Sequence, residues 1–273
     1  MSEPEYQPLS LETPAWGEIA MSRWDSEVFG FPVAMYRATD ASAINRNLPD
    51  VRNALERWAA ENEVELIGCS PSATEPMWRL CLPRLGFLYV DSTLTYTQPK
   101  LHRAKFPRSY AVRLAAMEDQ PAVERIAEQA FNVGRFHADP FFPRSLANLR
   151  FRRWLEEAFL SLSSSSRIYV TGELGAVTAF THSNVEGDRA YITIGGADPA
   201  FQGRGAGAAV FLGTLEALRD SGVRRTQSKL SASNTAMMNL TAYAGCRFSD
   251  PQNVFHWHAR DATHLSEFGA LDS

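Results

Sequence analysis

The chain has 273 residues, 45% of them apolar, with a net charge of -4 and a pI of about 5.9. This length and apolar content are enough for the buried core of one large domain or two small ones. The acidic balance excludes a broad basic surface for nucleic acid or an anionic membrane, so an anionic ligand has to be held locally, by a few cationic side chains or by backbone amides.

The first 100 residues alternate strand and helix patterns, which predicts a small N-terminal α/β domain over residues 1–100. Asp50 is expected to cap a helix, because apolar residues follow it at helical spacing. The other elements predicted here are strands at Val33–Tyr36, Val64–Cys69 and Phe87–Tyr96, a helix interrupted by proline at Met77–Leu85, and a basic connector at 98–108.

The second half is more regular and is predicted to form a larger domain over residues 108–260, followed by a tail at 261–273. It opens with a strand from Tyr110, a helix from Pro121, an aromatic loop at 131–143 and a helix at about 145–160. Two short turns then join three strands, which predicts an antiparallel meander of Ile168–Thr171, Ala176–His182 and Ala190–Gly196.

A glycine-rich stretch follows the meander and leads into an amphipathic helix that ends near Gly222. A strand at Arg224–Leu230, a helix at Asn234–Tyr243 and a strand at Val254–His258 complete the domain. The same order of strand, helix, glycine and strand recurs weakly in the N-terminal half. That half is therefore interpreted as a truncated relative of the C-terminal half, and it is expected to bind no cofactor because it has no glycine-rich stretch.

The cysteines and the start of the chain predict a cytoplasmic protein. Cys69, Cys81 and Cys246 are widely spaced in apolar surroundings and are expected to be reduced. No metal is predicted, because His256 and His258 lie two apart on a strand with nothing ligand-like after them. The chain begins without a signal-peptide pattern, and no apolar run approaches the ~18 residues of a membrane span.

The stretch Gln202–Gly207 lies between a strand and an amphipathic helix and is the most informative part of the sequence. Glycines let the backbone approach a ligand and adopt positive φ angles. The following helix offers unpaired N–H groups and the positive end of its dipole. Together these features predict a diphosphate site that needs no net positive charge, to which Arg204 can add one ion pair.

Two other kinds of phosphate loop do not fit. The Walker loop requires Gly-Lys-Ser/Thr, which is missing from this stretch. The dinucleotide-binding loop requires Gly-x-Gly-x-x-Gly after a buried parallel strand, whereas Gly203, Gly205 and Gly207 are evenly spaced after strands that are predicted to be antiparallel.

The stretch Ala197–Gly207 closely resembles the acyl-CoA loop of the GNAT superfamily of N-acyltransferases, and the resemblance covers about 108–260. It implies an α/β (α+β) fold with a mixed, mostly antiparallel twisted sheet flanked by helices, and a smaller N-terminal α/β domain that resembles a truncated half of that fold. It also implies acetyl-CoA, or another acyl-CoA, as co-substrate and no metal. The implied cofactor contacts are Gly195, Ala197, Gln202, Gly203, Arg204, Gly205, Ala206, Gly207 and Asn234.

Two short motifs, Trp24–Phe31 and Arg135–Pro140, resemble a narrower group within the superfamily. These are the dTDP-fucosamine acetyltransferases, which acetylate the amine of a nucleotide-linked 4-amino-4,6-dideoxy sugar and pair a small N-terminal domain with a GNAT domain. The aromatic residues of the loop either line a sugar pocket or fill the core. The acceptor contacts implied by this resemblance are Trp24, Asp25, Phe29, Phe136 and Phe141.

The sequence departs from the family at the general acid. The family's tyrosine, seven residues after Asn234, is replaced by Thr241. Tyr243 lies about 200° further around the helix and is expected in the core. The proton donor for the departing thiolate is therefore open between water, Thr241 and Tyr191.

The base that deprotonates the ammonium is also open. His137, Asp139 and His182 are candidates, and a histidine titrates near neutrality. Each candidate also has a purely structural interpretation. Asp139 precedes Pro140 and can hold a turn, and His182 can hydrogen-bond at the end of a strand.

The leading hypothesis is an enzyme that moves an acetyl group from acyl-CoA to the amine of a small polar acceptor by direct attack in a ternary complex, since the sequence has no cysteine or serine elbow for a covalent intermediate. A second hypothesis is an acyltransferase of secondary metabolism with an unusual acyl-CoA or an acyl-carrier protein as donor. A third is a non-catalytic domain that binds acyl-CoA. The family resemblance also allows a homodimer.

Overall fold

The computed structural model describes residues 6–9, 14–98 and 110–259. The chain forms two compact units, of which unit 1 combines Met1–Thr93, Val133–Ala147 and Asp250–Ser273, and unit 2 combines Leu94–Asn132 and Asn148–Ser249. The units interleave along the chain, in contrast to the contiguous domains expected at 1–100 and 108–260. The expected tail and, apart from Gln98, the expected connector lie outside the described residues.

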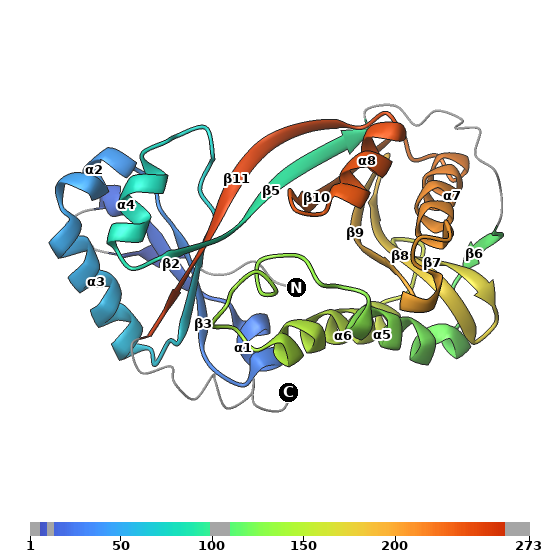
Figure 1. Cartoon of the computed structure of the whole chain (residues 1–273), viewed down its shortest axis with the longest axis horizontal. Helices are drawn as coiled ribbons and strands as arrows, with labels where there is room; N and C mark the ends of the chain where they lie inside the picture. Colours follow the sequence, from blue (N-terminus) through green and yellow to red (C-terminus); the bar gives the residue numbers. More distant parts are fainter. Residues whose placement is uncertain (1–5, 10–13, 99–109, 260–273) are drawn as a thin grey trace. The chain divides into compact units, whose positions relative to one another are not determined.

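Unit 1 is built on a sheet with the strand order β1-β2-β3-β4-β11 (Figure 1). β3 and β4 are parallel, because helices connect them, and the other pairs are antiparallel. Two strands, β5 (Leu88–Gln98) and β11, have residues in both units. The bounds of the others in this sheet are β1 (Gln7–Pro8), β2 (Glu18–Met21), β3 (Val33–Arg37) and β4 (Leu66–Cys69), and β11 covers Arg247–His258.

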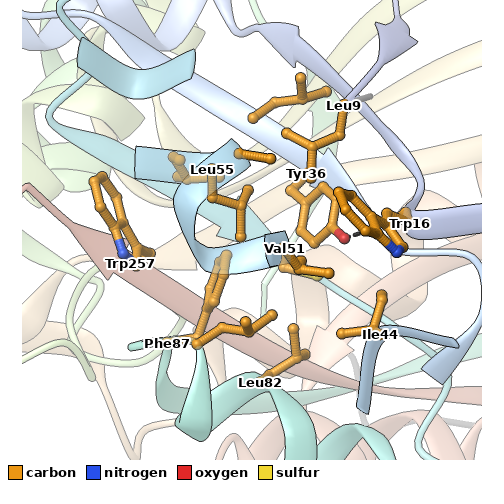
Figure 2. Packing of buried hydrophobic residues seen from close by; sticks show 14 of the residues in the cluster. Leu9, Trp16, Tyr36, Ile44, Val51, Leu55, Leu82, Phe87 and Trp257 are labelled. Atoms are coloured by element: carbon orange, nitrogen blue, oxygen red, sulfur yellow. Dashed lines mark hydrogen bonds between the residues drawn. The ribbon is translucent and has the colours of Figure 1, made fainter. Parts of the chain in front are cut away.

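The core of unit 1 lies between one face of this sheet and three helices, α2 (Ala41–Arg46), α3 (Leu48–Glu61) and α4 (Trp78–Arg84). Alternate residues of the strands point to this face, as a half-buried sheet requires. Tyr36 and Trp257 from the sheet pack in one cluster with Val51 and Leu55 of α3 and Leu82 of α4 (Figure 2).

The opposite face of the same sheet carries the intervening residues, and the segment Val133–Ala147 lies on it. A Cβ atom on Gly68 of β4 would come within 2.9 Å of the Met35 sulfur and 3.8 Å of Arg135 Nη1. Phe136 in the same segment has its ring centroid 5.3 Å from that of His256 on β11. The aromatic loop predicted from the sequence therefore covers the sheet of the N-terminal unit. The sequence pattern missed α1 (Arg23–Phe29) and β2, which both precede Val33.

The helix predicted after Asp50 begins elsewhere. Asp40 caps α2 by accepting the N–H of Ala43 at 2.9 Å, and Asn47 is the N-cap residue of α3. Asp50 lies in the first turn of α3, where a carboxylate interacts favourably with the helix dipole, and Pro49 precedes it at a position that needs no N–H donor. The expectation that Asp50 is the cap was therefore wrong by one helical turn.

Unit 2 contains the predicted antiparallel meander. Its order is β6-β7-β8-β9, with β10 added parallel to β9. The bounds are β6 (Val112–Leu114), β7 (Ser166–Glu173), β8 (Ala176–Glu186), β9 (Arg189–Ala197) and β10 (Arg225–Ser231).

Helices cover both faces of this meander (Figure 1). Tyr169 of β7 points to a cluster formed with α7, whereas its neighbours Ile168 and Val170 point to a cluster formed with α5 and α6. The four helices predicted from Pro121, at 145–160, after the glycine-rich stretch and at Asn234–Tyr243 are confirmed. Their bounds are α5 (Gln120–Gln129), α6 (Arg144–Leu160), α7 (Ala206–Asp220) and α8 (Thr235–Tyr243).

Among the described helices, none combines the length and the apolar character needed to cross a lipid bilayer.

Candidate functional site

A β-bulge in β9 changes the face to which its side chains point. The register of β9 against β8 shifts between His182 and Ser183, so that Thr193 is the extra residue. Ile192 therefore packs in the α7 cluster, whereas Ile194, two residues on, packs in the α5 cluster. A bulge bends a strand and increases its twist.

The strands β9 and β10 stop pairing where this bulge begins. Their parallel ladder ends at Tyr191 and Gln227, although β9 continues to Ala197 and β10 to Ser231. The bend explains the separation, because a strand that twists away cannot keep its ladder. The edge of β9 toward β10 is therefore left without that ladder around Gly195, where an extended ligand can pair with the main chain.

The predicted glycine loop follows β9 directly. Gly203 and Gly205 have φ angles of +72° and +88°, and a Cβ atom at either position would meet nothing within 4 Å. Backbone conformation, rather than lack of space, therefore favours glycine at these two positions. Asp198 holds the start of the loop, because it accepts the N–H of Ala200 at 2.9 Å and pairs with Arg125 at 3.1 Å.

The loop ends in backbone N–H donors at the start of α7. α7 begins at Ala206, so the N–H groups of Ala206 and Gly207 have no acceptor within the helix. Such donors, together with the positive end of a helix dipole, are the features that bind anions at helix N-termini. The exposed Arg204 lies beside them, and the Gln202 side chain ties the loop to β9 through the carbonyl of Ala197, at 3.4 Å.

Asn234 and Thr241 make local hydrogen bonds within α8. Asn234 is the N-cap residue, and its side-chain oxygen accepts the N–H of Met237 at 3.1 Å. The buried hydroxyl of Thr241 lies 2.9 Å from the carbonyl oxygens of Met237 and Met238, so its proton is directed into its own helix. The structure thus gives Thr241 a structural role, while the contact of Asn234 with a cofactor stays a prediction.

Tyr243 was expected in the core, and this expectation was wrong. Its side chain is 65% exposed. α8 has nine residues and buries only Thr241 completely, so its far end projects from the sheet. Tyr191, the other hydroxyl considered as a proton donor, is also exposed and lies at the last pair of the β9–β10 ladder.

His182 is buried in the meander with both ring nitrogens engaged. Its Nδ1 lies 2.6 Å from the Thr193 hydroxyl and its Nε2 lies 3.1 Å from the Ser166 hydroxyl. Burial lowers the pKa of His182 to about 4, so the ring is neutral near pH 7. A neutral ring whose nitrogens are both occupied packs the sheet and has no free nitrogen for an amine.

Asp139, in unit 1, is brought to two histidines that sequence reasoning did not connect with it. Its Oδ2 lies 2.6 Å from Nδ1 of His256 and 2.8 Å from Nε2 of His258. Burial raises the pKa of this carboxyl, but the hydrogen bonds from the two histidines outweigh burial and hold the pKa well below its usual range. The spacing of His256 and His258 places both side chains on one face of a strand, but a further ligand was considered only after them, whereas Asp139 lies more than a hundred residues before them.

The two motifs that carried the narrower resemblance contact each other in unit 1. Arg135 Nη2 lies 3.3 Å from Asp25 Oδ2, and the rings of Phe29 and Phe136 are 5.0 Å apart. Of the loop aromatics, Phe136 and Phe142 are buried against Phe29, whereas Phe141 is exposed.

The remaining predicted residues of these segments, Trp24 and His137, are partly buried. The backbone N–H of His137 donates to the carbonyl of Gly134 at 3.0 Å, which belongs to the turn of the loop.

Comparison with known proteins identifies the domain that contains the glycine loop. Residues 98–228, which include the meander, the loop and α7, match the family model described as "Acetyltransferase (GNAT) domain". No curated protein matches the sequence at a significant level.

Solved structures with a similar fold extend over most of the chain. A GCN5-related N-acetyltransferase from Sphaerobacter thermophilus is 15% identical with a TM-score of 0.63, over 90% of this chain and 77% of that one. A functionally unknown conserved protein from Staphylococcus epidermidis is 12% identical with a TM-score of 0.61, over 94% and 95%. A tandem GNAT protein from the clavulanic acid biosynthesis pathway is 15% identical with a TM-score of 0.52, over 84% and 76%.

The fold and the matched domain define a class. The protein has the GNAT fold, with a mixed sheet flanked by helices, and the match of residues 98–228 to the GNAT acetyltransferase domain supports an acetyltransferase enzyme. Acetyltransferases of this kind use acetyl-CoA as co-substrate, and the glycine loop lies inside the matched segment.

Proposed function

We propose that the protein transfers an acetyl group from acetyl-CoA to the amine of a small polar acceptor, by direct attack in a ternary complex. The observation that carries this proposal is the end of the β9–β10 ladder at Tyr191, which leaves the last part of β9, up to Ala197, without that ladder on the approach to the glycine loop. Main-chain groups of β9 around Gly195 would pair with the pantetheine arm. The amides from Gly203 to Gly207 would hold the pyrophosphate at the start of α7.

Positioning supplies most of the rate in this proposal. Holding the amine and the thioester together corresponds to an effective molarity of about 10⁵–10⁸ M. One general acid raises the rate by only about 10²–10⁴-fold, so positioning contributes more than a single proton transfer. A thiol with a pKa near ~8.5 leaves tolerably as thiolate. The buried Thr241 is therefore compatible with turnover, and the exposed Tyr191 and water remain the proton donors.

For the acceptor we propose a nucleotide-linked amino sugar. The support is the pair of motifs Trp24–Phe31 and Arg135–Pro140, which share the Asp25–Arg135 ion pair at 3.3 Å. Asp25 and Phe136 are buried in that packing, so they would shape the acceptor site by holding the loop. Trp24 and the exposed Phe141 would be the residues that touch the sugar nucleotide.

A second candidate changes the donor and the acceptor. One structural relative is a tandem GNAT protein of clavulanic acid biosynthesis, and it is similar over 84% of this chain. This relative favours a secondary-metabolism acyltransferase, with an unusual acyl-CoA or an acyl-carrier protein as donor. A non-catalytic acyl-CoA-binding role is the third candidate, favoured by the replacement of the family's tyrosine with the internally bonded Thr241.

Thiol release separates these candidates. The protein is mixed with acetyl-CoA and a panel of nucleotide-linked amino sugars, free amino sugars, polyamines and amino acids, and calorimetry with acetyl-CoA and desulfo-CoA measures binding in parallel. We expect binding of both CoA compounds and turnover with an amino-sugar nucleotide.

The other outcomes of this assay each discard part of the proposal. Turnover only with another amine would discard the sugar and keep the enzyme. Tight binding without turnover on any amine would favour the non-catalytic role, and turnover with a long-chain or carrier-bound donor would favour the second candidate. Failure of both CoA compounds to bind would overturn the cofactor site.

A further inference from the structure

Three metal-ligand side chains from distant parts of the chain converge in unit 1. One ligand atom from each of Asp139, His256 and His258 lies within 4.8 Å of the others. The side chains of Asp139 and His256 are 0% and 1% exposed, and that of His258 is 15% exposed. Within the described part of the chain, this is the one group of three histidine, cysteine or acidic residues with such spacing.

The backbone holds these side chains in place. His256 and His258 are two residues apart on β11, so they point to the same face, and pairing with Gly68 and Leu66 of β4 fixes the strand. Asp139 is fixed by the turn that precedes Pro140, because its Oδ1 accepts the N–H of Phe141 at 2.9 Å. Three ligands carried by fixed backbone cost little ordering entropy when they bind an ion.

The chain by itself does not complete the bonding of the two rings. The nitrogens that face Asp139 are Nδ1 of His256 and Nε2 of His258. The other two ring nitrogens, Nε2 of His256 and Nδ1 of His258, are buried and have no hydrogen-bond partner among the residues that the structure describes. Buried nitrogens without a partner are uncommon, but these two do not face Asp139, so the nitrogens available to an ion beside Asp139 are Nδ1 of His256 and Nε2 of His258.

Charge favours a cation at this cluster. Two buried carboxylates, Asp25 and Asp139, lie on this face of the unit, and Arg135 forms its ion pair with Asp25 at 3.3 Å. Buried charges in proteins are paired or coordinate metals.

We propose that Asp139, His256 and His258 bind a divalent first-row transition ion of the Zn²⁺ type. Two imidazoles and one carboxylate are a donor set that such ions prefer over Mg²⁺ or Ca²⁺. The bound ion ties the segment Val133–Ala147 to β11 and acts as a structural clamp. This inference does not depend on the acetyl transfer proposed above.

Binding changes the present contacts in a defined way. The separations of 2.6 and 2.8 Å between Asp139 Oδ2 and the ring nitrogens are hydrogen-bond lengths. The ion takes the place of the two N–H protons, with metal–nitrogen bonds of about 2.0–2.1 Å, and the carboxylate oxygen moves back. Each proton moves to the outer nitrogen of its ring, so neutral imidazoles release no net proton.

The test uses the full-length protein after chelator treatment. Calorimetry with Zn²⁺ and the visible ligand-field absorption of Co²⁺ measure affinity, stoichiometry and ligand type. We expect one site per chain with micromolar or tighter affinity, a Co²⁺ spectrum typical of nitrogen and oxygen ligands that Zn²⁺ abolishes, and a higher melting temperature with Zn²⁺.

Matched variants locate the site. His258→Gln and Asp139→Asn each remove one ligand, and we expect each to weaken Zn²⁺ binding at least about 100-fold, since even outer partners of metal ligands are worth about 10–100-fold. His182→Gln is the control, because His182 lies in unit 2 with both nitrogens hydrogen-bonded, and we expect it to retain Zn²⁺ affinity.

The wild-type measurement keeps the proposal falsifiable even if a variant fails to fold. No stoichiometric Zn²⁺ or Co²⁺ binding by the wild-type protein would overturn it. So would binding that neither folded variant weakens, because the ion would then lie elsewhere on the chain.

Discussion

At the scale of single residues, the shape of the glycine loop depends on the backbone conformation of its glycines. Gly203 and Gly205 adopt positive φ angles, and a Cβ atom at either position would meet no neighbour. Glycine is therefore favoured here by its backbone freedom and not by a lack of space. Side-chain-bearing residues pay about 1–2 kcal/mol for that region of φ. The sequence predicted this loop from its glycines ahead of an amphipathic helix and from its resemblance to the acyl-CoA loop of the GNAT superfamily.

Gly205→Ala is expected to weaken acetyl-CoA binding by about 10-fold or more. The alanine either strains the loop or shifts φ, and a shift turns the N–H groups at the start of α7 away from the pyrophosphate. Calorimetric titration with acetyl-CoA measures the loss.

Gly222→Ala provides the matched control for this substitution. Gly222 has a φ of +96° with nothing within 4 Å of a Cβ atom, and it follows the opposite end of α7. The same local strain there should leave acetyl-CoA affinity unchanged. Equal effects of the two alanines on affinity would show that general destabilisation, and not the loop, is being measured.

At the scale of elements, α7 is packed closely against the edge of the meander. A Cβ atom on Gly213, in the middle of α7, would come within 2.9 Å of Val112 Cβ on β6 and closer still to Val112 Cγ2. Glycine inside a helix costs about 1 kcal/mol of helix propensity relative to alanine. The chain accepts that cost because the strand approaches the helix here.

Gly213→Ala is expected to lower the free energy of unfolding by about 1–2 kcal/mol, although alanine is the better helix former. Overpacking costs about 1–3 kcal/mol, which exceeds the gain in propensity. Urea unfolding measures the change.

The double variant Val112→Ala/Gly213→Ala tests the cause. Removing the valine methyl groups relieves the closest contact, with Cγ2, and leaves only the Cβ contact at 2.9 Å, so the double variant should be more stable than the sum of the single changes predicts. Simple additivity would show that the contact between Gly213 and Val112 is not what destabilises the single variant.

At the scale of the whole molecule, the two units are assembled from interleaved segments. The aromatic loop and the last strand, both expected in the second domain, belong to unit 1. Buried histidines then make each unit sensitive to acid, since His182 in unit 2 and His256 in unit 1 both have pKa values lowered by burial to about 4.

Stability is expected to fall as the pH drops from about 6.5 to 4. The folded pKa of His182 lies below its unfolded value of ~6.5, so the unfolded chain binds the proton first. The stability contributed by neutral His182 is complete above pH ~6.5 and is lost progressively down to about 4, on the order of 2–3 kcal/mol. Urea unfolding at several pH values measures it.

His182→Gln isolates this effect. Glutamine does not titrate, so the variant should lose less stability over the same pH range, even if it is less stable at pH 7. The Asp119 carboxyl, whose pKa is lowered to about 2 by hydrogen bonds from Arg113, also loses its stabilising effect in acid, but it does so equally in the wild type and the variant and therefore cancels in the comparison. Parallel pH profiles of the wild type and the variant would contradict the prediction.

Local sequence patterns were sufficient to predict the elements around the glycine loop. Strand periodicity, two short turns and the glycine stretch predicted the meander, the loop and α7, because each of these is set by neighbours in sequence. The cap of α3 was misplaced by one turn, and Tyr243 was wrongly expected in the core, because helix ends and burial depend on what a helix packs against.

The sequence by itself determined the strand and helix pattern of the GNAT domain and the backbone that can hold a diphosphate. Only the tertiary structure decided that Asp139 meets His256 and His258, that His182 and Thr241 are occupied by local hydrogen bonds, and that the aromatic loop belongs to unit 1. The physical reason is that contacts between distant segments depend on which strands pair and on which segment covers each face of a sheet. Neither can be seen in the pattern of neighbouring residues in a single sequence.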